Sequence, residues 1–113
     1  MSLATAINEI DFSPGNVTYV DFPLTLDMPP LNHLDKLKED MLQVEYDDNI
    51  IVDVGWYPSR DPHGRFRLYV IQELDWENPI FSAETRGIKD ILWLLANISD
   101  YVESICQKTS RNL

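Results

Sequence analysis

Hydrophobic side chains occupy every second position of residues 50–57 and again of the first part of residues 65–74, a spacing typical of β-strands with one buried face. The segment between them, residues 58–64, contains two prolines and a glycine, which favour a turn. We therefore expect a β-hairpin, with the side chain of Trp56 in the core. Gly55, on the opposite face, indicates a bulge or a close approach of another backbone segment.

Two other segments show the spacing of three and four residues that is typical of helices. Over residues 87–107 this hydrophobic stripe is long and wide, which predicts a helix covered on more than one side. A shorter stripe over residues 33–44, preceded by the candidate N-cap Asn32, predicts a second helix.

The remaining segments are shorter or lie at the ends of the chain. Residues 17–26 alternate as a strand, and Pro23, which lacks an amide donor, places that strand at a sheet edge or a bulge. Residues 80–83 form a short strand. Residues 1–12 are expected to be an arm or a short helix, and residues 109–113 a frayed tail.

These elements predict a single α+β domain over residues 1–113. Its expected architecture is two-layer, an antiparallel β-meander covered on one face by the long C-terminal helix and the shorter helix. The length of 113 residues and the apolar content of 44% fit one domain with one core. Where the first strand joins the sheet stays open.

The charge of the chain is unevenly distributed. Of the formal net charge of −10, residues 1–57 carry −9, from eleven acidic residues against two lysines, while residues 58–113 carry −1, from eight acidic residues against seven basic ones. A field of one sign repels nucleic acid and acidic membranes and attracts basic partners. We therefore expect no direct binding to nucleic acid or to a membrane.

No pattern in the sequence points to catalysis, a metal or a cofactor. Neither His33 nor His63 lies at zinc-ligand spacing from other ligands, and the acidic turn at residues 47–49 lacks the spacing of an EF-hand. Cys106 has no nearby base to activate it. We predict that the protein is not an enzyme and has no catalytic residues, metal or cofactor. A small enzyme or a metal-binding protein is the least favoured alternative.

Cellular location is predicted from the single cysteine and from the N-terminal segment. One thiol cannot form an internal disulfide, which fits a reducing compartment. The first residues lack the basic and apolar regions of a signal peptide, and no apolar run is long enough to cross a membrane. The expected location is the cytoplasm.

One local cluster of arginines stands out in this acidic chain. It comprises Arg60, Arg65 and Arg67. We interpret these side chains as partners in ion pairs with nearby acids rather than as a phosphate-binding site. The acids expected to form those pairs are Asp61, Glu73 and Asp75.

Small size, acidity, a single thiol and a meander followed by a C-terminal helix form a recognisable layout, accompanied by the segments Val54-Gly55-Trp56-Tyr57 and Asp75-Trp76-Glu77-Asn78-Pro79. In these features the chain resembles bacterial immunity proteins of contact-dependent growth inhibition and related polymorphic toxin systems. The resemblance carries over no individual binding residue. It implies a cytoplasmic antitoxin that blocks one cognate toxin domain, often a nuclease.

The expected function is that of a small acidic inhibitor that covers a basic surface on another protein, such as a toxin nuclease domain. The alternative is an adaptor or homodimeric interaction subunit with no inhibitory role, for which the acidic surface serves solubility.

The expected partner-binding surface combines acidic side chains with aromatic anchors. Its residues are Glu39, Asp40, Glu45, Tyr46, Asp47, Asp48, Asp53 and Trp76, with Asp21 and Asp27 as outer members. The exposure of Trp76, which lies in a turn, stays open.

Overall fold

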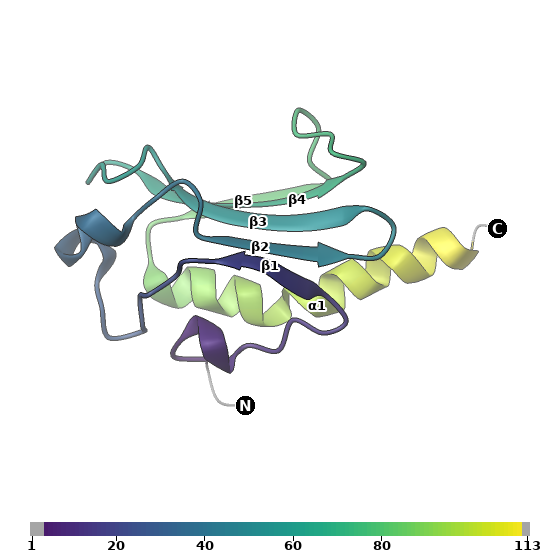
Figure 1. Cartoon of the computed structure of the whole chain (residues 1–113), viewed down its shortest axis with the longest axis horizontal. Helices are drawn as coiled ribbons and strands as arrows, with labels where there is room; N and C mark the ends of the chain where they lie inside the picture. The colour runs from purple at the N-terminus through teal and green to yellow at the C-terminus, as the bar shows by residue number, and fades with distance from the viewer. Residues whose placement is uncertain (1–3, 112–113) are drawn as a thin grey trace.

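The computed structural model describes the backbone of residues 4–111 and the side chains of residues 4–106. Five strands form one antiparallel sheet in chain order, and the C-terminal helix lies along one face of it (Figure 1). The elements are β1 (Asn16–Val20), β2 (Leu42–Tyr46), β3 (Ile50–Tyr57), β4 (Arg65–Gln72), β5 (Phe81–Thr85) and α1 (Ile88–Arg111). The α+β class and the antiparallel meander are confirmed.

The central hairpin of β3 and β4 forms as the alternation of side chains predicts. Trp56 pairs with Phe66 in the register, both side chains are fully buried, and their rings meet edge to face with centroids 5.0 Å apart. The indole Nε1 of Trp56 donates a hydrogen bond of 2.8 Å to the carbonyl oxygen of Asp61 in the following loop. The side chain thus joins the core to the loop that closes the hairpin.

Helix α1 supplies the side of the core that faces the sheet. Its inward-facing side chains are Ile88, Ile91, Leu92, Leu95, Ile98 and Val102, and they pack with the buried side of the sheet in one cluster. Trp93 is 55% exposed, so the side of the helix that carries it is not covered, contrary to the prediction that the helix is covered on more than one side. No helix in the described part of the chain is long and apolar enough to cross a membrane.

The prediction of a second helix over residues 33–44 is wrong. The chain forms two short 3-10 turns, η2 (Pro30–Asn32) and η3 (Leu34–Lys36), and then runs extended into β2. The backbone bonds to β3 instead of to itself: the amide of Trp56 donates to the carbonyl oxygen of Lys38 at 2.7 Å, and the amide of Met41 donates to that of Val54 at 3.0 Å. Leu37, Met41 and Leu42 of the predicted stripe are buried without a helix.

Gly55 explains how this extended segment can pass so close to the sheet. A Cβ atom placed on Gly55 would lie 1.8 Å from the carbonyl oxygen of Glu39, so no other residue fits without moving that backbone. The close approach inferred from Gly55 is confirmed.

Strand β1 is shorter than the predicted strand of residues 17–26 and lies at a sheet edge, as Pro23 indicates. It pairs with β2, and a bulge between Val17 and Tyr19 breaks the expected alternation. Phe22 and Leu24 are buried beyond the end of the strand.

The two ends of the chain and the last strand also differ in detail from the prediction. The N-terminal segment includes a 3-10 turn, η1 (Ile7–Glu9), β5 begins one residue later than predicted, and α1 extends to Arg111. Residues 1–3 of the predicted arm and residues 112–113 of the predicted tail lie outside the described residues.

Candidate protein-binding surface

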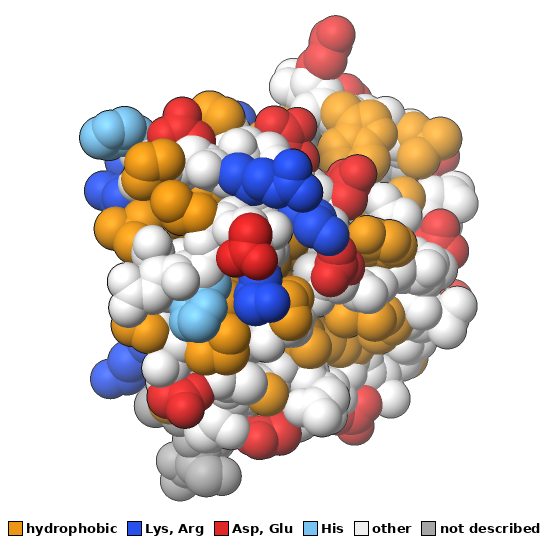
Figure 2. Space-filling model, turned by 60° about the vertical axis from the view of Figure 1, so that its left-hand side comes forward, with side chains coloured by type: hydrophobic (Ala, Val, Ile, Leu, Met, Phe, Trp, Pro, Cys, Tyr) orange, Lys and Arg blue, Asp and Glu red, His pale blue; other side chains and the backbone are white. Residues whose placement is uncertain are grey.

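Within residues 4–111, no α-helix lies over the sheet face opposite α1 (Figure 1), and we call this the open face. The strand register places on it a mixture of aromatic, acidic and other polar side chains. They include Tyr19, Gln43, Glu45, Asp53, Tyr57, Arg67, Tyr69 and Glu84. One view of the molecular surface shows hydrophobic and acidic side chains together in its right-hand part, with basic side chains confined to the left and centre (Figure 2).

The structure brings some of the predicted binding residues together and separates others. Asp40 lies two residues before β2 and acts electrostatically on Asp53 of β3. Asp47 and Asp48 lie in the turn at the other end of β2, a strand of five residues that spans roughly 16 Å. Glu45 is exposed on the open face between the two groups. The predicted acidic run is therefore spread along one strand rather than concentrated at one point.

Asp53 is the most unusual of these acids because its side chain is buried, with 8% of the residue exposed. Burial, reinforced by the nearby charge of Asp40, raises the pKa of Asp53 from 3.8 to about 6, while a hydrogen bond with Gln43 acts in the opposite direction. Burial and then the charge of Asp53 likewise raise the pKa of Tyr57 to about 12. This part of the open face therefore disfavours additional negative charge.

The arginine cluster has partners other than those expected. Arg67 lies opposite Glu84 in the register, with its Nε 3.0 Å from a carboxylate oxygen of Glu84, and Arg65 lies 3.8 Å from the same group. The Arg67 N–H is not aligned for a hydrogen bond, so the contact is an ion pair. The pairing predicted with Asp61, Glu73 and Asp75 is wrong because β5, not the loops, lies beside β4.

The prediction that Tyr46 is an aromatic anchor on the partner-binding surface is wrong. It is buried, and its hydroxyl forms a hydrogen bond of 2.7 Å with the hydroxyl of Ser99 on α1. The alternation of β2 turns this ring toward the helix and Glu45 toward the open face.

Replacing Tyr46 by Phe is expected to lower the free energy of unfolding by about 1 kcal/mol, because the Ser99 hydroxyl loses its buried partner. Urea unfolding of the variant, alongside Ser99→Ala and the double variant, measures the coupling between the two residues. If the two single effects add without coupling, the bond contributes nothing to stability.

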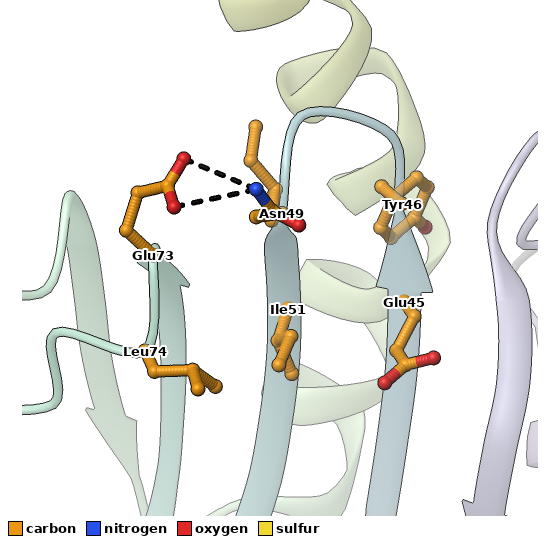
Figure 3. A pocket seen from close by; sticks show the side chains of 7 residues that line it. Glu45, Tyr46, Asn49, Ile51, Glu73 and Leu74 are labelled. Atoms are coloured by element: carbon orange, nitrogen blue, oxygen red, sulfur yellow. Dashed lines mark hydrogen bonds between the residues drawn. The ribbon is translucent and has the colours of Figure 1, made fainter.

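Trp76 is available at the surface. It is 47% exposed, in the loop between β4 and β5, close in sequence to the exposed Leu74. A hollow of about 360 Å³ lies where this loop meets the turn between β2 and β3. Its lining includes Glu45, Ile51, Glu73 and Leu74, and Asn49 donates to both carboxylate oxygens of Glu73 at 3.1 and 3.3 Å (Figure 3).

Two further hollows lie along β2. One, of about 330 Å³, is lined by Tyr19, Asp40, Leu42, Gln43 and Asp53. The other, of about 270 Å³, lies on the α1 side of the sheet at the end of β2 and is lined by Pro14, Tyr46, Asp47, Asp48, Val102, Glu103 and Cys106. All three hollows contain at least two carboxylates and no basic side chain. Within the described residues, no group of three or more His, Cys, Asp or Glu side chains could hold a metal ion.

The described ion pairs leave these hollows without compensating charge. Lys38 pairs with Asp21 at 2.8 Å, and the two arginines pair with Glu84. Asp21, expected as an outer member of the binding surface, is therefore locally compensated. The carboxylates that line the hollows are not among those paired.

Sequence reasoning missed Tyr19, Gln43, Glu73 and Leu74 as members of this surface. The first two belong to β1 and β2, where a bulge and an incorrect helix assignment concealed which side chains share a face. No family model matches the chain, and neither a curated protein nor a solved structure matches it.

Proposed function

We propose that the protein is an acidic inhibitor that covers a basic surface on another protein, as an immunity protein covers its cognate toxin, and that it does so in the cytoplasm. The observation that supports this function best is the set of acidic hollows along β2 with no basic side chain in their lining. Charges left uncompensated in the free protein are available to a partner, and complementary charge speeds association.

The open face has the composition of a binding surface as well as the charge. Protein interfaces are enriched in tyrosine and tryptophan. The exposed Tyr19 lines a hollow with Asp40 and Asp53, and the exposed Trp76 lies in the same loop as Leu74, which lines another. A nuclease domain fits as the partner because enzymes that bind phosphates present lysine and arginine around their clefts.

The proposal is tested with the genes that adjoin this one in its genome. Each adjacent product is expressed in a bacterial host with and without this protein, and growth is measured. An inhibitor is expected to restore growth to cells that express one toxic neighbour and to form a 1:1 complex with its toxic domain. A toxic neighbour that is neither bound nor neutralised would contradict the proposal.

Reversing charge at the β2–β3 turn is expected to weaken this complex without unfolding the protein. Asp47 and Asp48 are both exposed, so replacing them with Lys removes two attractive charges and adds two repulsive ones. Association rates measured at low and high salt give the effect, which is expected to fall at high salt. The matched control replaces the exposed Asp35 and Asp100 with Lys; equal weakening by both variants would exclude a localised contact at the turn.

The edge strand β1 supports the alternative of a homodimeric subunit. Val17, Tyr19 and Val20 are all exposed on it, and an open edge can pair with another strand. Sedimentation of the purified protein distinguishes the two functions: a monomer that binds a toxic neighbour supports the inhibitor, and a stable dimer without such a partner supports the subunit.

A further inference from the structure

The open face already shows how it holds a cationic side chain. The guanidinium carbon of Arg67 lies 5.2 Å from the centre of the Tyr57 ring, and its Nε lies 3.0 Å from Glu84. An aromatic ring and a carboxylate together form a site for a planar cation.

A second group of a ring and carboxylates lies nearby on the open face, and no basic side chain lines it. In the register, Tyr19 pairs with Gln43, Gln43 with Asp53, and Asp53 with Tyr69. Tyr19, Gln43 and Asp53 line the hollow of about 330 Å³ together with Asp40. The hollow thus offers a ring, an amide and two carboxylates, which are the groups that bind a guanidinium.

The groups that surround Asp53 leave its carboxylate without a nearby positive charge. Facing it are Tyr19 from β1, Gln43 from β2, Tyr57 from β3, Tyr69 from β4, and Asp40 from the segment before β2. None of these is basic, and Lys38, which acts electrostatically on Tyr19, is already paired with Asp21. A buried carboxylate beside a second carboxylate is unfavourable when charged, unless a cation joins it.

We infer that this hollow receives an arginine side chain of the bound protein, with the guanidinium between the carboxylates of Asp40 and Asp53 and against the ring of Tyr19. This assignment rests on the proposed function, since it names the group by which the basic partner is held. Arginine fits better than lysine because its planar fork can engage two carboxylates at once.

The test titrates the isotopically labelled full chain with the blocked tripeptide Gly-Arg-Gly and follows amide and carboxyl signals by NMR. Saturable shifts are expected at Tyr19, Gln43 and Asp53. Two matched peptides carry citrulline, which is neutral and nearly the same shape, or lysine in place of arginine. The citrulline peptide is expected to leave these signals unmoved, and the lysine peptide to bind more weakly.

Replacing Asp40 and Asp53 together with Asn is expected to weaken binding of the arginine peptide at least about tenfold, through the loss of both charge-assisted contacts. The control, Asp35→Asn with Asp100→Asn, removes the same net charge from exposed positions elsewhere and is expected to bind like the wild type. Shifts centred on the turn at residues 47–48, or equal affinity for arginine and citrulline, would overturn the assignment.

The cellular assay separates failure of this inference from failure of the proposed function. If the wild type and the Asp40 and Asp53 double variant neutralise the toxic neighbour equally well, that result would overturn the arginine site and still support the inhibitor function. Binding of the arginine peptide at Asp53, with no neutralisation of any adjacent product, would support the site and overturn the inhibitor.

Discussion

Asp53→Asn is expected to make the free protein more stable at neutral pH, by about 2–3 kcal/mol, because it removes a buried negative charge. The folded pKa of Asp53 is about 6, above its ordinary value of 3.8, so the folded state prefers the protonated carboxyl. Stability contributed by that preference is fully present below pH 3.8 and is lost as the pH rises through 6. Asn resembles the protonated form, so the gain should be absent at low pH and complete above pH 6.

The measurement is urea unfolding of both proteins across this pH range, compared as a difference so that other titrating groups cancel. Asp100→Asn, at an exposed position on α1, is the matched control and should change stability by less than about 0.5 kcal/mol. If the unfolding free energies of Asp53→Asn and the wild type differ by the same amount at every pH, the buried charge of Asp53 does not destabilise the protein.

Trp56→Ala is expected to destabilise the protein by about 3–5 kcal/mol. The side chain is fully buried against Phe66, so its removal leaves a cavity that the surrounding sheet cannot close. It also removes the hydrogen bond to the carbonyl oxygen of Asp61, which holds the loop between β3 and β4. Thermal unfolding followed by circular dichroism measures the loss.

Trp76→Ala provides the matched control, since it removes the same side chain from an exposed loop. We expect it to change stability by less than about 0.5 kcal/mol and to weaken partner binding if Trp76 is an anchor. If both substitutions lower the melting temperature equally, the assignment of the core is wrong.

The elements that the sequence predicts correctly are those with one consistent period. In the central hairpin and in α1, each buried side chain follows a spacing of two or of three and four, and turn residues mark where the pattern stops. Residues 33–44 satisfy a helical stripe and then an alternating one, because Leu42 belongs to both. Only the long-range bonds to β3, which a local pattern does not contain, decide between the two.

The candidate site also has one part that the sequence predicts and another that depends on the strand order. The excess of acid in the first half of the chain predicts a negative surface. The structure places Glu45 and Asp53 on neighbouring strands and Asp40 just before β2, none of them in a described ion pair. Their grouping with Tyr19 depends on which strand lies beside β2, and the direction of Tyr46 depends on the phase of that strand. Neither follows from composition or charge.

The open face contains a buried carboxylate without a cation, and the titration of Asp53 tests this most directly. Carbon-detected NMR of the labelled full chain follows the side-chain carboxyl of Asp53 as the pH is raised. We predict a midpoint at about pH 6 in the free protein, and a lower midpoint when the arginine peptide is bound. A midpoint near 3.8 in the free protein, unchanged by the peptide, would contradict the account.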